Sequence, residues 1–332
     1  MIAMVACAPE MPTEIEQLIK TSTITPEMSE TPPPESPSPT PSQSKVILLI
    51  SAEADPSIII LFQQQLESMA FEAGLAFEVL DDLSSEMLTS NVKIVVGIGP
   101  GLNLDEVAVS NPEISFLLVN QAQIALAENI SQIGDPIEDK RRKAFMAGYL
   151  AALVSTDYKI AALVPSDIDE RDLILDSFIT GARFFCGICR PKYPPYNTFP
   201  QWETVPSEAT NQGFQESVDT LISQGVENLF VSGGLATPGL LSYLTEAGVY
   251  VVGDTQPEQI SNNWIGTVGV DYVAALVELW PQLLDGVGGI RTPPPTTIMD
   301  RNLKLVSEGR YRLFLEIATD LEAGLIAVGS AP

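Results

Sequence analysis

Lys45-Val-Ile-Leu-Leu-Ile-Ser51 is the stretch of sequence that decides the fold. An apolar, β-branched run of this length is typical of a strand that is buried on both faces of a sheet. The segment from Pro56 to Gly74 follows it and is predicted to be a helix, with proline at its start and glycine at its end. This strand and helix together predict a βα unit of a parallel sheet.

The same alternation of strands and helices continues along the chain. The predicted elements are Ala76 to Leu80, Lys93 to Gly99, Ile114 to Asn120, Pro136 to Val154, Tyr158 to Pro165, Asp172 to Phe185, Asn211 to Gln224, Asn228 to Gly234, Thr237 to Ala247 and Val249 to Asp254. Small residues in the long helix from Pro136 would let it lie close against the sheet. Two such series in tandem predict an α/β protein with two similar lobes of mostly parallel sheet.

Residues 1–44 differ in composition from the rest of the chain. From Ala8 to Ser44 they are rich in Pro, Ser, Thr and Glu, which predicts a disordered, extended tether. Met4-Val-Ala-Cys7 resembles a bacterial lipobox, so Cys7 is a candidate for lipidation; the alternative is an ordinary cysteine in the tail. We find no apolar run of about 18 residues, and therefore expect attachment to a membrane by lipid alone.

The charge balance excludes several classes of function. Lys+Arg number 17 against 43 for Asp+Glu, giving a net charge of -26, so neither nucleic acid nor a lipid headgroup of an anionic membrane surface is expected as the main partner. The chain has no histidine, which excludes Ser-His-Asp and Cys-His catalysis and the imidazole ligands of metals. We expect neither a metal nor a cofactor. Lys140-Arg-Arg-Lys143 is a basic cluster that we interpret as a solvated helix face; a phosphate site and a contact with a permease are the alternatives.

Cys186 and Cys189 form a C-x-x-C motif. It precedes prolines rather than opening a helix, which argues against a redox enzyme. A four-thiolate zinc site is impossible, because Cys7 is the only other cysteine. We expect an extracellular disulfide, and a reduced, packed pair is the alternative.

Several short motifs occur in an order that resembles a known family. The resemblance is to the basic membrane protein (BMP-type) group of substrate-binding lipoproteins of ABC transporters, and it covers Lys45 to Val328. The residues that carry it are Met146 to Ala152, Lys159 to Val164, Ser177 to Ala182, Ser223 to Phe230, Gly233-Gly234, Gly248 to Asp254 and Glu316 to Val328.

This resemblance implies the type 1 periplasmic binding protein fold, with two Rossmann-like lobes of parallel sheet joined by a multi-strand hinge. The expected first lobe comprises residues 45–155 and about 266–290. The expected second lobe comprises residues 156–265 and about 291–330.

Ligands of such sheets bind beyond the carboxyl ends of the strands. The loops there are polar or acidic and contain glycine, which suits hydroxyl-bearing or amine-bearing ligands and not phosphates. The family binds purine nucleosides, with aspartates that hold the ribose. The resemblance implies that Asp55 is the acid after the first strand and Asp254 the first acid of a later loop, but the second, ribose-binding acid of that loop is replaced or displaced near Gln256, and Asn120 stands where an aspartate is expected. The full set of candidate ligand residues is Asp55, Phe62, Asn120, Asp167, Phe178, Gly233, Gly234, Asp254, Gln256 and Trp264.

The resemblance implies a monomeric solute-binding protein outside the cytoplasm, anchored to the membrane by lipid. It would capture a small organic ligand, such as a nucleoside, and deliver it to an ABC permease with its ATPase, without being an enzyme. One alternative is a ligand-sensing receptor without transport. Another is a hydrolase that uses carboxylates such as Asp167 and Asp169.

Overall fold

Residues 43–328 are described by a computed structural model. Cys7 and the predicted tether, apart from Gln43 and Ser44, lie outside the described residues. Within these residues no helix combines the length and the apolar character needed to cross a bilayer.

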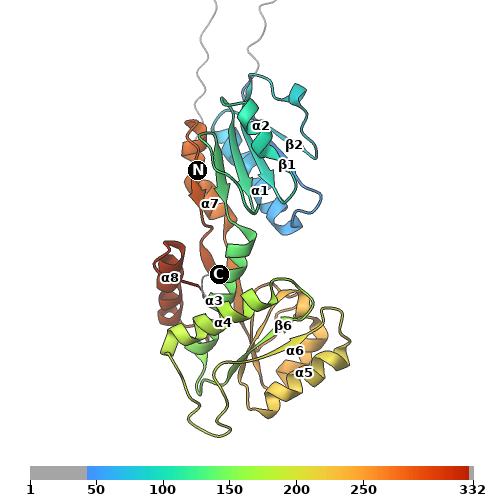
Figure 1. The fold of residues 1–332 in the computed structure, drawn as a ribbon, viewed down its shortest axis with the longest axis vertical. Helices are drawn as coiled ribbons and strands as arrows, with labels where there is room; N and C mark the ends of the chain where they lie inside the picture. The colour runs from blue at the N-terminus through green and yellow to red at the C-terminus, as the bar shows by residue number, and fades with distance from the viewer. Residues whose placement is uncertain (1–42, 329–332) are drawn as a thin grey trace, which may run out of the picture. The chain divides into compact units, whose positions relative to one another are not determined.

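The first sheet has the strand order β11-β5-β4-β3-β1-β2, with every neighbouring pair parallel. Its strands are β1 (Lys45–Ile50), β2 (Ala76–Leu80), β3 (Val92–Ile98), β4 (Ser115–Val119), β5 (Ile130–Ile133) and β11 (Arg291–Thr292). Helices α1 (Pro56–Glu72) and α7 (Tyr272–Leu284) cover one face, and α2 (Leu104–Ser110) covers the other (Figure 1). Alternate residues of β1 enter the two cores, which is why this strand is apolar throughout.

The second sheet has the order β12-β10-β9-β8-β6-β7, and only its β10–β12 pair is antiparallel. Its strands are β6 (Ile160–Pro165), β7 (Gln201–Val205), β8 (Asn228–Val231), β9 (Tyr250–Gly253), β10 (Trp264–Val270) and β12 (Thr296–Met299). Helices α3 (Pro136–Val154), α4 (Arg171–Cys186) and α8 (Glu308–Glu322) pack on one face. Helices α5 (Asn211–Ser223) and α6 (Pro238–Glu246) pack on the other (Figure 1).

Each sheet with its helices is one lobe, so the predicted α/β fold with two lobes of mostly parallel sheet is confirmed. Among the described residues the chain passes between the lobes three times. The crossings are residues 134–135, which join β5 to α3, residues 271–272, which join β10 to α7 and include the first residue of that helix, and residues 293–295, which join β11 to β12. We call these three segments the hinge.

Helix α3 packs against α4 with the two backbones in direct contact. A Cβ on Gly148 would lie 2.1 Å from the Phe178 carbonyl oxygen, and one on Gly181 would lie 1.9 Å from the Phe145 carbonyl oxygen. The small residues of α3 thus serve a helix–helix contact, in addition to the expected packing on the sheet. Because α3 begins at the hinge, this contact anchors the hinge to the second lobe.

The α3–α4 contact leads to a prediction about stability. We expect Gly148→Ala to lower the free energy of unfolding by about 2–3 kcal/mol, because the new methyl group must push two helix backbones apart. Urea denaturation measures the change. Gly309→Ala in α8 is the matched control, since a Cβ there meets no atom within 4 Å. We expect the control to be neutral or slightly stabilising, and equal losses in both variants would refute the packing argument.

Candidate functional site

The order of the strands defines a crevice at the carboxyl edge of each sheet. In the first lobe the chain runs from β1 to β2 on one side and returns to β3 on the other side of β1. In the second lobe β6, β7 and β8 are related in the same way. Loops that leave neighbouring strands in opposite directions open a binding crevice between them. The loops concerned are Ser51 to Asp55, Gly99 to Gly101, Ser166 to Asp169 and Ser232 to Gly234.

The two crevice loops of the first lobe are held close together. A Cβ on Gly99 would lie 2.7 Å from the Cβ of Ala54, and Gly99 has a φ of +88° that favours glycine. The Ser51 amide donates to the Ile98 carbonyl at 3.0 Å. These contacts fix the loop that carries Asp55 at the start of α1.

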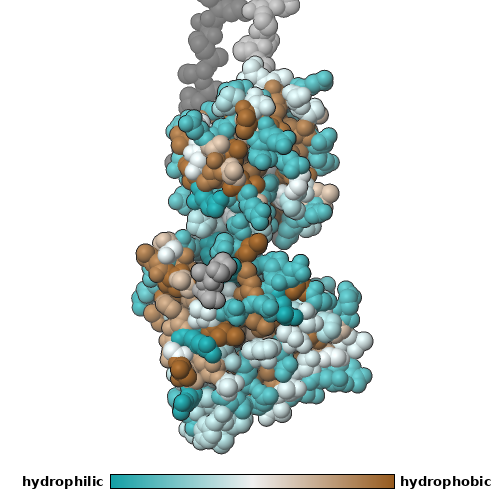
Figure 2. Space-filling view, viewed as in Figure 1, coloured by the Kyte–Doolittle hydropathy of each residue, from teal (hydrophilic) through white to brown (hydrophobic). Residues whose placement is uncertain are grey.

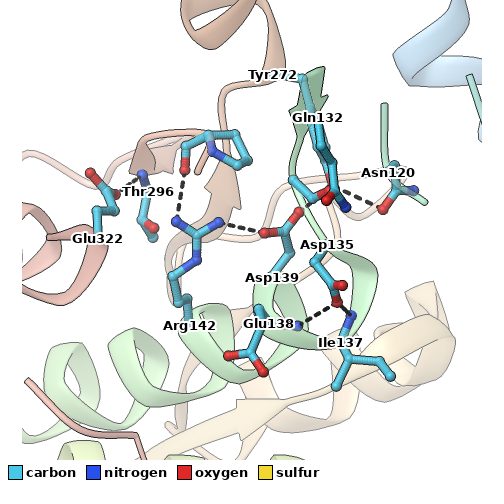
Figure 3. Close-up of polar contacts among 12 residues, drawn as sticks. Asn120, Gln132, Asp135, Ile137, Glu138, Asp139, Arg142, Tyr272, Thr296 and Glu322 are labelled. Carbon is cyan, nitrogen blue, oxygen red and sulfur yellow. Dashed lines mark hydrogen bonds and ion pairs between the residues drawn. The ribbon is translucent and has the colours of Figure 1, made fainter. Parts of the chain in front are cut away.

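The hinge contains a buried ion pair that contacts all three crossings (Figure 3). Asp139 and Arg142 lie in the first two turns of α3 and are paired through Asp139 Oδ1 and an Arg142 Nη atom, with both side chains more than nine-tenths buried. The Tyr272 hydroxyl donates to Asp139 Oδ2 at 2.7 Å, and Arg142 Nη1 donates to the Pro294 carbonyl at 3.2 Å. Two residues of α3 thereby bind the second and third crossings.

The first crossing is held against the same ion pair by close packing. Gly134 has a φ of +70°, and a Cβ there would lie 2.6 Å from Tyr272 Cε1 and 2.7 Å from Asp139 Oδ2. Only glycine leaves room for these two side chains at this backbone conformation. We call Gly134, Asp139, Arg142, Tyr272 and Pro294 the hinge cluster.

Polar side chains of the first lobe extend the hinge cluster towards the carboxyl edge of its sheet (Figure 3). Asn120 follows β4 with a φ of 53°, and its Oδ1 lies 3.2 Å from the Tyr272 hydroxyl. Gln132 is wholly buried, and its Nε2 donates to the carbonyls of Gln121 and Gly134 at 2.6 and 3.0 Å. The loop after β4 is therefore tied to the first crossing.

The second lobe is connected to the third crossing through α8. A carboxylate oxygen of Glu322, in the last turn of that helix, accepts a hydrogen bond from the Thr296 amide at the start of β12 (Figure 3). Burial raises the pKa of the Glu322 carboxyl, and this effect exceeds the lowering by the Thr296 hydrogen bond and by Arg142. Glu322 thus fixes the strand that leaves the hinge.

Burial also controls the protonation of the hinge cluster. It raises the pKa of Asp139, although the charge of Arg142 and the hydrogen bond from Tyr272 oppose it. The pKa of Tyr272 is raised above its ordinary value by burial and by the Asp139 carboxylate, with a smaller contribution from Asp55. Tyr272 therefore stays protonated and donates its hydrogen bond to Asp139.

At the carboxyl edge of the second lobe, Asp254 joins the loops after β8 and β9. Its carboxylate accepts from the Gly233 amide at 2.8 Å and from the Ser232 hydroxyl at 3.1 Å. Lys143 Nζ, from α3, donates to the Asp254 carbonyl at 3.4 Å. Asp254 thus connects the loops after β8 and β9, and Lys143 connects the loop after β9 to helix α3, which begins at the hinge.

The other predicted polar residues lie in the loops where they were expected. Gln256 is exposed in the loop after β9, and Asp55 is exposed at the start of α1. Asp167 accepts hydrogen bonds from the Ser207 amide and hydroxyl at 3.0 and 2.7 Å, which lowers the pKa of its carboxyl. A Cβ on Gly234 would meet no atom within 4 Å, so its backbone is open to approach.

The three aromatic candidates lie in the hydrophobic cores. Phe62 is 0% exposed in the core under α1, and Phe178 is 0% exposed and stacked on Phe230 at 5.4 Å between ring centroids. Trp264 is 1% exposed beside α5 and α6. Each ring fills a core that the sheet needs for its stability, so none of the three faces a ligand in this structure. An aromatic residue in a strand or helix carries no signal that separates core from cleft.

The basic cluster of α3 also differs from the expectation of a solvated helix face. Arg142 is buried in the ion pair, and Lys140 binds Glu170 at 2.5 Å. Sequence reasoning missed the hinge roles of Asp139, Arg142 and Tyr272. One signal was available, because Asp135-Pro136 marks a capped helix start directly after a strand, and the Asp135 side chain accepts from the amides of Ile137 and Glu138.

Two further features lie outside the hinge. Cys186 and Cys189 are joined at the end of α4, with their Cα atoms 5.8 Å apart, a separation that suits a disulfide. A pocket of about 250 Å³ lies in the first lobe beside the ends of β1 and β2, and its walls include Ser51, Asp82 and Leu102.

Solved structures with the same fold are known. A solute-binding protein of an ABC transporter system from Conexibacter woesei is similar to this chain with a TM-score of 0.61 and 13% identity, over 86% of this chain and 98% of that one. A transcriptional activator of the comK gene from Bacillus halodurans is similar with a TM-score of 0.57 and 12% identity, over 83% and 97% of the two chains. No family model and no curated protein matches the sequence. The type 1 periplasmic binding protein fold is thus confirmed, while membership of the basic membrane protein group stays a prediction.

The hinge cluster yields a second prediction. Tyr272→Phe removes the hydroxyl that donates to the buried Asp139, so we expect it to lower the free energy of unfolding by about 1–3 kcal/mol. Chemical denaturation measures the loss. Tyr250→Phe, at a side chain that is 37% exposed, is the control and should be nearly neutral. A neutral Tyr272→Phe would show that this hydrogen bond does not stabilise the hinge.

Proposed function

We propose that this protein is a solute-binding protein that captures a small organic ligand between its two lobes. The observation that carries the proposal is the hinge cluster, in which all three crossings contact two residues of one helix. A hinge of this kind lets each lobe move as a rigid body while the crevice loops keep their geometry.

Binding energy drives closure in this mechanism. A ligand that contacts the loops of both lobes binds the closed state more tightly than the open state, and it shifts the equilibrium by that difference in affinity. Asn120 contacts Tyr272 of the hinge cluster, and Lys143, which follows Arg142 in α3, contacts the loop after β9. A ligand that contacts these crevice loops therefore contacts segments that are bonded to Tyr272 or to helix α3, next to the hinge. No bond in the ligand is made or broken.

The ligand is a neutral or cationic molecule that carries hydroxyl or amine groups. Asp55 is the carboxylate that we assign to it, with Asn120, Gln256 and the open backbone at Gly234 as further contacts. Asp254 and Asp167 act indirectly, because their oxygens hold crevice loops of their own lobe. Nucleosides are the first class to test, although the three buried aromatic rings supply no stacking platform in this conformation.

Delivery to an ABC permease completes the proposal. The similar structure from Conexibacter woesei is described as part of an ABC transporter system, and the fold is the same. Lipid on Cys7 and the tether of residues 1–44 would hold a monomer near a membrane outside the cytoplasm. Holding the receptor there raises its effective concentration at the permease.

The hydrolase alternative requires two carboxylates arranged as an acid and a base. Asp167 is instead engaged by Ser207 through two hydrogen bonds that favour its ionised form. A carboxyl group held in this way is a poor general acid. The loop that contains Asp167 and Asp169 is better explained as part of the ligand crevice.

A ligand screen tests the proposal and forms the third prediction. Purified protein is heated with nucleosides, pentoses, hexoses and small amines, and each mixture is then analysed for products. We expect one class to raise the melting temperature by about 2–4 °C at saturating concentration, and to be recovered unchanged. Turnover of that compound would contradict a binding role, and the absence of any shift would contradict capture of these classes.

Variants of two acids then test the site. Asp55→Asn should weaken binding of the identified ligand by about tenfold, because a charge-assisted hydrogen bond becomes a neutral one. Asp105→Asn changes an exposed acid of α2 in the same lobe and should leave affinity unchanged. Equal affinity of the two variants would remove Asp55 from the site.

A further inference from the structure

The loop between α4 and β7 lies in a long stretch of sequence without acidic residues. No Asp or Glu occurs between Asp176 and Glu203, although the chain carries 43 such residues. The same stretch contains three basic residues, Arg183, Arg190 and Lys192, and all three are exposed. The stretch is therefore locally basic within a chain that has a net charge of -26.

Large apolar and aromatic side chains protrude from this loop between the charges. Ile188 is 82% exposed, Tyr196 is 72% exposed and Tyr193 is 69% exposed. In Figure 1 the loop lies at the lower end of the second lobe, and Figure 2 shows hydrophobic, intermediate and hydrophilic atoms side by side at that end. We call Ile188, Arg190, Lys192, Tyr193 and Tyr196 the loop tip.

Contacts with the second lobe hold the loop tip in place. Asp157 Oδ1 accepts from the Lys192 amide, and Asp157 Oδ2 lies 2.9 Å from Lys159 Nζ. Lys159 in turn donates to the Pro194 carbonyl at 3.4 Å, and Asn197 Nδ2 donates to the Gln224 carbonyl at 2.7 Å. The side chains of the loop tip are thus presented on a braced backbone, which lowers the entropy lost when they bind.

The loop tip also lies away from the ligand crevice. Its braces, Asp157, Lys159 and Gln224, come just before the amino ends of β6 and β8. The crevice loops follow the carboxyl ends of the same strands. Binding at the loop tip is therefore compatible with an occupied crevice.

We propose that the loop tip binds the surface of an anionic phospholipid membrane. Tyrosine suits the boundary between hydrocarbon and water, and basic residues near an anionic bilayer contribute about fivefold each to its affinity. The net charge of the whole protein does not cancel this attraction, since charges beyond about 8 Å are screened at physiological salt.

The size of the loop tip favours a membrane over an acidic protein. Three protruding side chains offer roughly 400 Å², whereas a stable protein interface takes about 800 Å² from each partner. A fluid lipid surface can accommodate a few protruding side chains without a complementary shape. Interfacial residues of this kind bind weakly and reversibly.

Vesicle flotation with the full, unlipidated chain tests the proposal. We expect binding to vesicles of about 30 mol% phosphatidylglycerol in phosphatidylcholine, little binding to pure phosphatidylcholine, and loss of binding as salt increases. Arg190→Gln/Lys192→Gln and Tyr193→Ser/Tyr196→Ser should each reduce binding at least tenfold. Unchanged melting temperatures would show that both variants remain folded.

Two control variants remove side chains of the same kinds from positions outside the loop tip. Lys304→Gln/Arg312→Gln removes two exposed cations, and Leu303→Ser/Leu325→Ser removes two exposed apolar side chains. Both controls should bind as the unmodified chain does. The proposal is overturned if the unmodified chain does not float with anionic vesicles, or if the loop-tip variants and controls lose binding equally. It is also overturned if soluble polyglutamate binds the loop tip while vesicles do not.

Discussion

The buried ion pair between Asp139 and Arg142 is the interaction on which the arrangement of the two lobes depends. Taking both charges out of water is costly, and the pair is stable only because other groups satisfy it. Those groups are the Tyr272 hydroxyl and the Pro294 carbonyl, which belong to two crossings, while Gly134 of the third crossing leaves space for the aspartate. The cost of burial is thus offset only when all three crossings are in place.

This constraint connects the fold to the ligand crevice. Helix α3 begins at the hinge and is anchored in the second lobe through its contact with α4, while Tyr272 begins α7 of the first lobe. The crevice loops are in turn braced within their own lobes, by Asp254 in the second lobe and by the Gly99–Ala54 contact in the first. Each lobe therefore moves as a rigid body, and the movement of one lobe relative to the other takes place at the hinge cluster.

The sequence predicts the strands better than it predicts the side chains of the site. The strand at Ala76 to Leu80 is found with its predicted bounds although it is an edge strand without a buried residue, because Gly74 before it and Asp81 after it mark its ends. Residues 45–155 were expected to belong to one lobe, yet the buried side chains of α3 share a core with β6. The hydrophobic pattern of a helix predicts which of its faces is buried, but not which of the two sheets that face packs against. The sequence also predicts Phe62, Phe178 and Trp264 as ligand residues although they fill cores, because an aromatic residue carries no signal that separates core from cleft. The hinge role of Arg142 cannot be read from a basic run.

Hydrogen exchange measured by mass spectrometry on the Asp139→Asn variant tests the central claim most directly. The substitution leaves Arg142 buried without its counter-ion, so the account predicts faster exchange at all three crossings together, with the strand cores of both lobes still protected. The matched change Asp105→Asn should leave the exchange unchanged. Faster exchange confined to the first turn of α3, with the segments at Tyr272 and Pro294 unaffected, would contradict the claim that one ion pair holds the hinge.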